Sequence, residues 1–303
     1  MKKLKEIFLK QSGSVLVLVA FAFTGLMGMT GLAIDGGTIY MNKAELQKIA
    51  NAAVLSGAQE LTSEDEQDVR DIVDDITIQH NEQDTLGPVD ITMKDSVKVN
   101  LNKTVPLSFL KLFGIDTLDV RVDATAGLGV MGRAVGAVPL GVEEDYNFEY
   151  GETHFLKVGS GDSDYGEFGI LGLDGPGAKT YEETFRNGFD EELAIGDIVN
   201  TESGNISGKT SEVVEEKINQ CDDMNDRNCA RILLVPVYKP YNDDGGKVKQ
   251  VEITGFAYFY LLDPTTIEAD DDTVPGIFIE RTGTGFTETG AVNRGAYSIK
   301  LTE

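Results

Sequence analysis

The longest apolar run of the chain lies near its amino terminus. Residues 13–34 are 22 consecutive positions without a charged side chain, and Asp35 ends the run. An α-helix rises about 1.5 Å per residue, so this run spans about 33 Å, which matches the hydrocarbon core of a bilayer. The pattern therefore predicts a transmembrane helix over residues 13–34.

A second hydrophobic pattern follows directly and has helical spacing. Its apolar positions recur every three to four residues, as in an amphipathic helix; they are Leu46, Ile49, Ala50, Ala53, Gly57 and Leu61. Several members of this face are small, which leaves two interpretations open: contact with a partner helix, or ordinary packing in a helix–sheet core. Two arrangements stay open at Gly36 and Gly37: a hinge, because glycine weakens a helix by about 1 kcal/mol, or an unbroken helical rod of about 70 Å from residue 13 to residue 61.

The rest of the chain alternates between strand patterns and short helical patterns. A period of two predicts strands at residues 89–93, 96–101, 118–126, 232–238, 248–262 and 276–280. Helices are predicted at 62–84, 180–187 and 209–219, and a short helix or an apolar turn at 106–113. The predicted fold class is α+β, with an N-terminal transmembrane helix that continues into an extracellular helical arm, followed by a β-rich ectodomain with a few short helices.

These patterns divide the chain into five segments. They are a basic cytoplasmic start (1–12), a transmembrane anchor (13–34), a helical stalk (35–61), a stalk-proximal α+β unit (62–130) and a distal, acidic, glycine-rich, β-dominated ectodomain (131–303). The last boundary depends on a shift in composition after Val130, where glycine and acidic residues become frequent.

Charge is distributed unevenly and orients the predicted span. The 26 lysine and arginine residues against 51 aspartate and glutamate residues give a net charge of −25. Residues 1–12 hold four lysines and one glutamate, which is +3, so the other residues carry −28. Because positively charged flanks stay in the cytoplasm, we expect a single-pass protein of the cell membrane with a cytoplasmic N-terminus and an extracellular ectodomain. The acidity fits either a soluble exported domain or a salt-loving host, and it argues against a nucleic-acid partner.

A cleavable signal peptide is the alternative to a retained anchor. Its apolar core has about 7–15 residues, which is shorter than this run. Gly31-Leu32-Ala33 matches a small-x-small cleavage site only loosely. No cysteine stands directly after the run, which excludes a lipoprotein. We therefore expect a retained signal anchor.

The residues that follow the span resemble a known module. The span closes with Gly-Leu-Ala-Ile-Asp at 31–35, and Tyr40, Leu46-Gln47 and the segment Ala50-Asn51-Ala52-Ala53-x-Leu55-x-Gly57-Ala58 come next. This order resembles the N-terminal module of TadE/TadG-like proteins of the Tad (Flp) pilus-assembly system. The resemblance implies a motif or helix-packing role for Asp35, Tyr40, Leu46, Gln47, Ala50, Ala53, Gly57 and Ala58.

A second stretch between residues 99 and 129 is similar to these proteins as well. It contains Lys-Thr-Val-Pro-Leu at 103–107, Leu-Phe-Gly-Ile-Asp at 112–116 and alternating valine and alanine at 120–126. The chain also departs from the pattern. Prepilin-peptidase substrates carry a glutamate inside the apolar run, whereas Gly13 is followed by no acidic residue before Asp35, and no Asp-x-Ser-x-Ser motif of a von Willebrand A domain occurs.

Two cysteines are the main candidates for covalent chemistry. Cys221 and Cys229 enclose seven residues and lie on the predicted outer side of the membrane, where disulfides persist. A zinc site needs two more ligands, and neither His80 nor His154 has finger-like spacing. The two cysteines are predicted to form a disulfide rather than to remain free thiols.

Other chemical motifs are weak. The acidic sequences 222–226 and 270–272 offer oxygen ligands for calcium, but neither matches the EF-hand pattern. The glycine-rich loops match neither phosphate-binding pattern, and no Gly-x-Ser-x-Gly elbow occurs. We expect no catalytic residue, no metal ligand and no cofactor.

The leading hypothesis is a non-enzymatic, membrane-anchored surface protein, similar to TadE/TadG-like components of Tad pilus assembly. Its expected partners are the bilayer, through residues 13–34, and other pilus-assembly or pilin-like proteins, through the helical arm. One alternative is an anchored extracellular hydrolase that uses paired carboxylates. Another is an anchored adhesion or calcium-binding module, which an exposed aromatic cluster of Tyr146, Phe148 and Tyr150 would favour.

Overall fold

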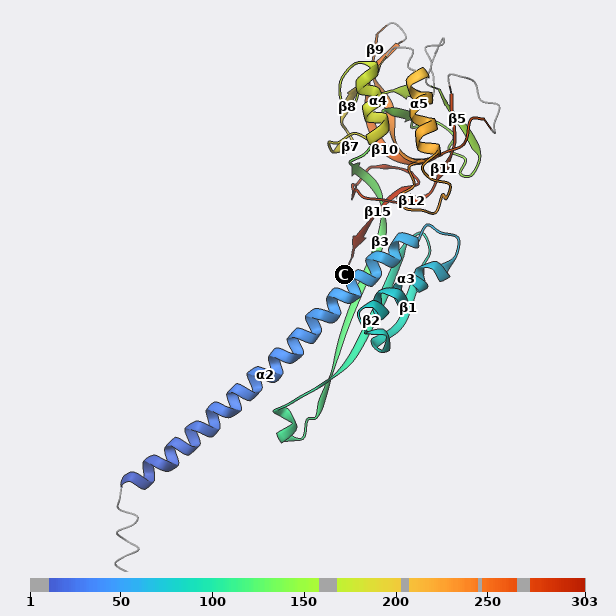
Figure 1. Ribbon diagram of the computed structural model, residues 1–303. Helices are drawn as coiled ribbons and strands as arrows, with labels where there is room; N and C mark the ends of the chain where they lie inside the picture. Colours follow the sequence, from blue (N-terminus) through green and yellow to red (C-terminus); the bar gives the residue numbers. More distant parts are fainter. Residues whose placement is uncertain (1–10, 158–167, 203–206, 245–246, 266–272, 303) are drawn as a thin grey trace, which may run out of the picture.

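The protein consists of one long helix and two β-sheets. The computed structural model describes residues 11–157, 168–202, 207–244, 247–265 and 273–302. Helix α2 (Gln11–Gly57) packs against a first sheet near its carboxyl end, and a larger sheet lies beyond it (Figure 1). We call the C-terminal half of α2, helix α3 and the first sheet the proximal unit, and the second sheet with its two helices the distal unit.

Helix α2 runs without a break through the predicted hinge. Gly36 and Gly37 both lie inside it, so of the two arrangements the structure has the continuous helix, about 70 Å long. Each glycine costs about 1 kcal/mol of helix stability, which a helix of 47 residues tolerates. In the apolar half, the hydroxyls of Thr24 and Thr30 donate to carbonyl oxygens four residues earlier, at 2.9 and 2.8 Å. The helix itself therefore satisfies these polar groups.

Helix α3 (Glu66–Gln79) folds back onto the end of α2 and confirms the predicted acidic helix. Asp65 begins it as the N-cap, because its Oδ1 accepts a hydrogen bond from the backbone N–H of Gln67 at 2.8 Å. The approach of the two helices needs a glycine. A methyl group added at Gly57 would lie only 2.8 Å from Cγ2 of the buried Val73.

The proximal sheet is built on a long antiparallel hairpin. Its longer strands are β1 (Leu86–Thr92), β2 (Ser96–Pro106), β3 (Thr117–Ala134) and β15 (Ala296–Leu301), and three two-residue strands, β7, β12 and β13, complete it. β2 pairs with β3 along its whole length, and a turn containing the 3₁₀ helix η3 (Leu110–Phe113) joins them. This turn confirms the apolar turn or short helix predicted at 106–113.

The C-terminal strand returns to the proximal unit. β15 pairs antiparallel with β3, so that Leu301 lies opposite Ala126. The unit boundary predicted after Val130 falls inside β3, which is one continuous strand. The chain thus passes between the two units more than once, a connection that local patterns do not reveal because it depends on pairing across more than 160 residues.

The distal sheet has the strand order β5-β11-β10-β9-β4-β6. Helices α4 (Ala178–Asn187) and α5 (Ser207–Ile218) cover one of its faces (Figure 1). The central strand β10 is buried on both sides: Phe256 and Tyr258 join one core cluster, and Phe259 joins the other. The strand therefore lies between two layers, and its apolar side chains alternate between the two cores.

The distal strands and helices confirm the sequence patterns that predicted them. The three longest strands are β9 (Ile232–Asp244), β10 (Lys247–Leu261) and β11 (Thr273–Ile279). The remaining short elements are η1 (Ala58–Glu60), η2 (Gln83–Thr85), β4 (Leu140–Glu143), β5 (Thr153–Lys157), β6 (Phe168–Ile170), β7 (Leu193–Ala194), β8 (Ile198–Asn200), β12 (Arg281–Thr282), β13 (Phe286–Thr287) and β14 (Val292–Arg294). The α+β fold class is confirmed.

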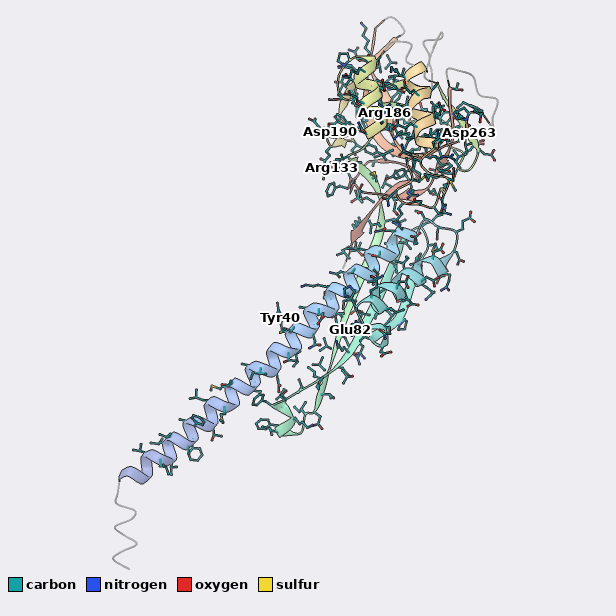
Figure 2. The ribbon with its side chains drawn as sticks, in the orientation of Figure 1. Tyr40, Glu82, Arg133, Arg186, Asp190 and Asp263 are labelled. Carbon is teal, nitrogen blue, oxygen red and sulfur yellow. A yellow bond between two sulfur atoms is a disulfide. The ribbon has the colours of Figure 1, made fainter. Side chains whose placement is uncertain are left out.

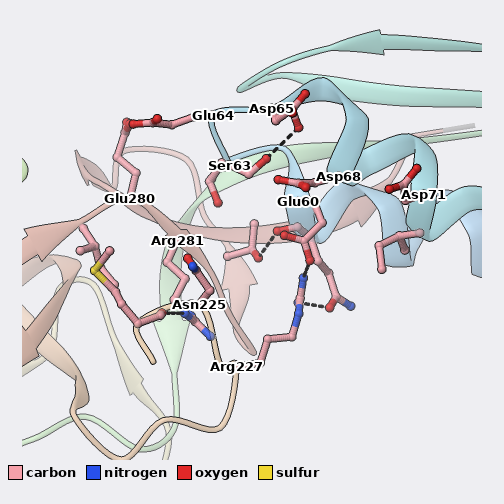
Figure 3. Close-up of a pocket in the computed structure, with 16 residues that line it drawn as sticks. Glu60, Ser63, Glu64, Asp65, Asp68, Asp71, Asn225, Arg227, Glu280 and Arg281 are labelled. Atoms are coloured by element: carbon pink, nitrogen blue, oxygen red, sulfur yellow. Dashed lines mark hydrogen bonds and ion pairs between the residues drawn. The ribbon is translucent and has the colours of Figure 1, made fainter. Parts of the chain in front are cut away.

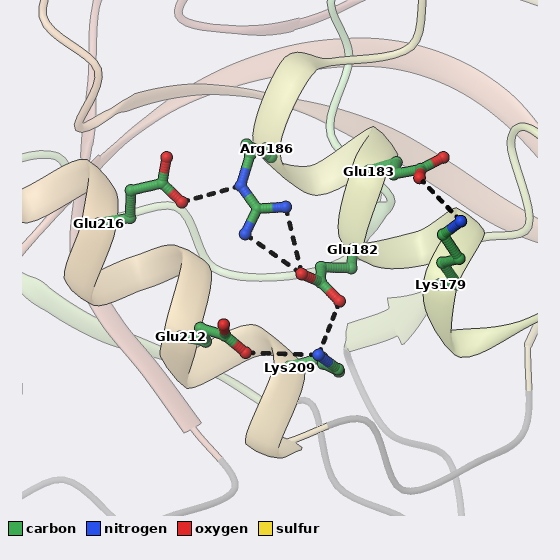
Figure 4. Close-up of polar contacts among 7 residues, drawn as sticks. All are labelled: Lys179, Glu182, Glu183, Arg186, Lys209, Glu212 and Glu216. Atoms are coloured by element: carbon green, nitrogen blue, oxygen red, sulfur yellow. Dashed lines mark hydrogen bonds and ion pairs between the residues drawn. The ribbon is translucent and has the colours of Figure 1, made fainter.

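A network of ion pairs connects α4 to α5 (Figure 4). Glu182 lies at its centre, 2.9 Å from Nζ of Lys209 and 3.2 Å from the guanidinium of Arg186, which also contacts Glu216 at 2.8 Å. The hydrogen bond from Lys209 is the main cause that holds the pKa of Glu182 below its ordinary value, with Arg186 adding to it against the opposing effect of desolvation. The network fixes the two helices side by side over the sheet.

Cys221 and Cys229 form the predicted disulfide, with their Cα atoms 5.4 Å apart. The bridge closes the loop between α5 and β9. Within this loop, the carbonyl oxygens of Met224 and Asp226 accept hydrogen bonds from Arg281 at 3.1 and 3.2 Å. The disulfide thus shapes a loop that contacts the strand leading back to the proximal unit.

Candidate functional site

The small-residue face of the helical arm lies in the core of the proximal unit. Its members are buried against β2, β3 and α3; they are Leu46, Ile49, Ala50, Ala53, Gly57, Ala58 and Leu61. The opposing side chains include Val97, Val99, Val120 and Val122, which alternate along the hairpin. Of the two interpretations that the sequence left open for this face, the structure shows the core packing, because the protein's own sheet covers it.

Gln47 joins the arm to the hairpin through a polar contact. Its side-chain Nε2 donates to the carbonyl oxygen of Asp123 on β3 at 2.8 Å, and to Oδ1 of Asn51 one helical turn later at 3.1 Å. A buried or half-buried polar side chain needs such partners, since an unpaired one costs about 1–3 kcal/mol. Gln47 therefore fixes the register between the helix and β3.

Tyr40 lies on the opposite side of the arm. Its side chain is 74% exposed, as is that of the neighbouring Met41 at 71%. Figure 2 shows Tyr40 on the side of α2 that faces away from the hairpin. Of the family-like residues, Tyr40 is thus the one that the fold leaves accessible to another protein.

Asp35 marks the point where the hairpin tip meets the helix. It is buried, and its carboxylate accepts three backbone hydrogen bonds: from Ser108 at 2.8 Å, from Phe109 at 2.9 Å and from Leu110 at 2.6 Å. Desolvation alone would raise the pKa of this carboxyl, but the three N–H donors outweigh it and hold the pKa below its ordinary value. Asp35 therefore satisfies the otherwise free N–H groups at the start of η3.

Gly31 lies one helical turn before Asp35 and contacts the same tip. A methyl group added at Gly31 would overlap with the ring of Phe109, so the ring packs directly on the helix backbone. The sequence placed Gly31 in the family-like motif at 31–35 and in a loose cleavage site, and it did not single out Phe109. Two features of the sequence indicate such a contact: the turn predicted at 106–113 is apolar, and the span ends with a glycine and an aspartate that can receive it.

The first half of α2 has the character of a membrane span. The helix is long and apolar enough to cross a bilayer. Nearly all of its side chains between Val15 and Ile34 are exposed, including large ones such as Leu16, Phe21 and Met29. The buried exception in this stretch is Gly31, under Phe109. A soluble core helix of this composition would be covered by protein, and this one is not.

Comparison with known families matches this same segment. Residues 13–60 match the family model Tad, described as "Putative Flp pilus-assembly TadE/G-like". Residues 13–60 are therefore similar to a TadE/G-like module, and we call them the TadE/G-like module. The module coincides with α2 and the short η1 turn, so it contains both the exposed apolar half and the half that packs on the hairpin. No curated protein and no solved structure matches the chain.

A polar cleft of about 720 Å³ lies where the TadE/G-like module meets the distal unit (Figure 3). Several acids line it, and their contacts serve the junction: Glu60 pairs with Arg227, and Glu280 pairs with Lys94. Asp65 caps α3. Three of the lining acids thus have structural partners, whereas Glu64, Asp68 and Asp71 line the same cleft and are the acids that a carboxylate hydrolase would draw on.

The residues of the other sequence hypotheses are placed as follows. Tyr146 and Phe148 pack against the distal core around Phe278, and the Tyr146 hydroxyl lies 2.6 Å from Nδ1 of His154. Tyr150 is exposed, with 43% of its surface accessible, so it is the only one of the three that the fold leaves on the surface. Residues 270–272 lie outside the described residues. In the part of the chain that the structure describes, no group of three or more His, Cys, Asp or Glu side chains converges on a metal position.

Proposed function

We propose that the protein is a non-enzymatic, membrane-anchored component of Tad (Flp) pilus assembly. The observation that carries the proposal is the TadE/G-like match over residues 13–60, which covers the whole of the proposed anchor and arm. The exposed apolar half of α2 supports the anchoring, because water is a poor solvent for a helix surface of about 33 Å without charge.

The proposed orientation places residues 1–12 in the cytoplasm and the two folded units outside. The local charge of +3 before the span supports it, since lysine-rich flanks are retained on the cytoplasmic side. The disulfide between Cys221 and Cys229 supports it as well, because such bonds persist in oxidising compartments. Fusing alkaline phosphatase after residue 303 gives active enzyme if the C-terminus is outside, and inactive enzyme would reverse the topology.

The proposed partner surface of the arm is its exposed face around Tyr40 and Met41. The small-residue face is unavailable to a partner, because β2 and β3 cover it. The arm would then use its two sides differently. Its small residues pack on the protein's own sheet, and the side chains of Tyr40 and Met41 contact another pilus-assembly protein.

A genetic experiment tests the assembly role. Deleting the gene is expected to abolish Tad pili and surface adhesion, and the full-length chain supplied in trans is expected to restore them. Cells that assemble normal numbers of pili without the gene would refute the pilus role. A variant in which the cleft acids Asp68 and Asp71 are replaced by asparagine is expected to restore as many pili as the wild-type chain, because the proposed role needs no catalysis.

Photocrosslinking tests the partner surface. A photoreactive residue at Tyr40 is expected to form adducts with another membrane or pilus-assembly protein in cells. The matched control at Ala53 is expected to crosslink only within the chain, because Ala53 is fully buried. Intermolecular adducts at Ala53 but not at Tyr40 would overturn the assignment of the two faces.

A further inference from the structure

The tip of the β2–β3 hairpin exposes apolar side chains beside the proposed anchor. Every residue from Lys111 to Asp119 is exposed. Among them, Leu112 is 79% exposed, Phe113 is 75% exposed and Ile115 is 47% exposed. A cluster of large apolar side chains at the end of a hairpin is costly in water, and in native proteins it marks a contact with another apolar phase.

The position of the tip along α2 is fixed by two contacts. Phe109 packs on Gly31, and Asp35 holds the backbone N–H groups of Ser108, Phe109 and Leu110. Gly31 lies four residues inside the apolar run, which is about 6 Å along the helix axis from Asp35. A bilayer that covers residues 13–34 therefore reaches the tip as well, and in Figure 1 the η3 turn lies beside the apolar half of α2.

The backbone of the tip is suited to an apolar environment. Seven N–H groups between Leu107 and Ile115 donate to protein oxygens, three of them to Asp35 and four to backbone carbonyls. Gly114 closes the turn with a φ of 87°, a conformation that glycine adopts without strain. Paired backbone groups are the main requirement for peptide segments that enter the hydrocarbon boundary.

The polar side chains of the tip fit the headgroup region. Lys111 and Asp116 lie 3.8 Å apart on the same turn and are both about two-thirds exposed. The long stem of Lys111 allows its ammonium to reach the phosphates while Leu112 and Phe113 stay deeper. Further from the tip the hairpin becomes polar, with Thr104 bonded to Asp119 at 2.7 Å. The hairpin therefore changes from apolar to polar side chains near the level of Asp35, where α2 makes the same change.

We propose that the β2–β3 tip is a second membrane contact, which inserts Leu112, Phe113 and Ile115 into the interface of the bilayer beside the anchor. This inference rests on the membrane anchoring proposed above. Two contacts restrain the tilt and rotation of α2, which one helix leaves free. The rigid proximal unit would then stand at a fixed angle to the membrane, with Tyr40 presented on one side.

Single-tryptophan variants test this inference, because the chain contains no tryptophan. The probe is Phe113→Trp in full-length protein reconstituted into phosphatidylcholine vesicles at high lipid excess. Phe23→Trp, in the middle of the apolar run, reports the anchor. Phe286→Trp is the water-exposed control; it lies on β13, which pairs with the end of β3 that is far from the hairpin tip. All three phenylalanines are more than half exposed, so the substitutions leave the cores intact.

The readout is the tryptophan emission maximum and its quenching by lipids brominated at different depths. Phe113→Trp is expected to shift to the blue and to be quenched more by bromine near the headgroup than by bromine near the chain end, because interfacial segments lie about 5–10 Å into the headgroup boundary. Phe23→Trp is expected to show the reverse order of quenching. Phe286→Trp is expected to show neither shift nor quenching.

The outcomes separate the tip from the anchor. Quenching of Phe23→Trp without quenching of Phe113→Trp would overturn the tip contact and leave the anchor in place. Absence of quenching at Phe23→Trp would refute the anchoring itself. A blue shift of Phe113→Trp that disappears on further dilution with lipid, without quenching by brominated lipid, would assign the tip to a second copy of the chain and overturn the proposal.

Discussion

The two halves of α2 share one continuous backbone and differ in what surrounds their side chains. Before Asp35 the helix exposes large apolar residues in all directions, whereas from Leu46 onward it buries one face against β2 and β3. The exposed half has apolar residues all round and the buried half has them on one side, as expected for a lipid-facing span and for an amphipathic helix. The comparison shows that the arrangement of side chains alone gives one regular helix an apolar surface all round in its first half and a single apolar face in its second half.

Leu46→Ala is expected to have the largest effect and to distinguish the two halves most clearly. Leu46 is fully buried, and its truncation is expected to lower the free energy of unfolding by about 2–5 kcal/mol. The matched change Leu32→Ala, on an exposed position of the same helix, is expected to change it by less than about 0.5 kcal/mol. Urea unfolding of the full chain in detergent micelles, followed by circular dichroism, measures both. Equal losses would contradict the division of α2.

Ala53→Leu tests the same division by adding volume. Ala53 is fully buried in the proximal core, so the larger side chain is expected to cost about 1–3 kcal/mol through overpacking. Gly25→Leu is the control, because nothing lies within 4 Å of the position where its side chain would begin. It is expected to leave the stability unchanged or to raise it by up to about 1 kcal/mol, since glycine disfavours a helix. A loss at Gly25 in the same unfolding experiment would show that the first half is packed after all.

Asp35→Asn tests the contact at the border between the halves, and its effect depends on pH. Because the pKa of Asp35 is lower in the folded protein, the ionised carboxylate stabilises the fold above its ordinary pKa of 3.8. This stabilisation is lost as the pH falls through the lower folded-state value. The melting temperature of Asp35→Asn is therefore expected to lie below that of the wild type at pH 7 and to converge with it in acid. Calorimetry of both proteins from pH 7 downward measures the difference, and a gap that grows in acid would have the wrong sign. Asp90→Asn, on an exposed position of β1, is the control.

Tyr40→Ala is expected to have the smallest effect on stability and the most specific effect on assembly. Tyr40 is exposed, so its removal is expected to change the free energy of unfolding by less than about 0.5 kcal/mol. The number of pili per cell, counted by electron microscopy, is nevertheless expected to fall. Normal piliation with Tyr40→Ala would remove the exposed face of the arm from the proposed partner surface.

Much of the local structure was predictable because it depends on neighbours in the sequence. The charge-free run and the three-to-four spacing after it predicted α2, and the alternation at 118–126 predicted the middle of β3. At Gly36-Gly37 the sequence left a hinge and an unbroken rod open, and the structure has the rod, because a local propensity of about 1 kcal/mol per glycine is small beside the hydrogen bonding of a continuous helix.

The candidate site was predictable only in part. The residues named from the family resemblance are found on α2 and, for Ala58, at the start of η1, but their roles diverge: Ala50 and Ala53 are core residues, Gln47 bonds to β3, and Tyr40 is exposed. Spacing along a helix shows which residues share a face, but it does not show what that face meets. Phe109 was missed for the same reason, since its partner Gly31 is separated from it by the whole of α3, β1 and β2.

The sequence by itself determined the apolar span, the acidic balance, the α+β class and the proximity of Cys221 and Cys229, because each depends on composition or on short spacing. Only the tertiary structure decided that β15 closes the proximal sheet, that the small-residue face is internal and that Asp35 holds the hairpin tip against the span. These features join segments that are distant in sequence, and their energies come from packing and hydrogen bonds that form only when the sheet has its native register.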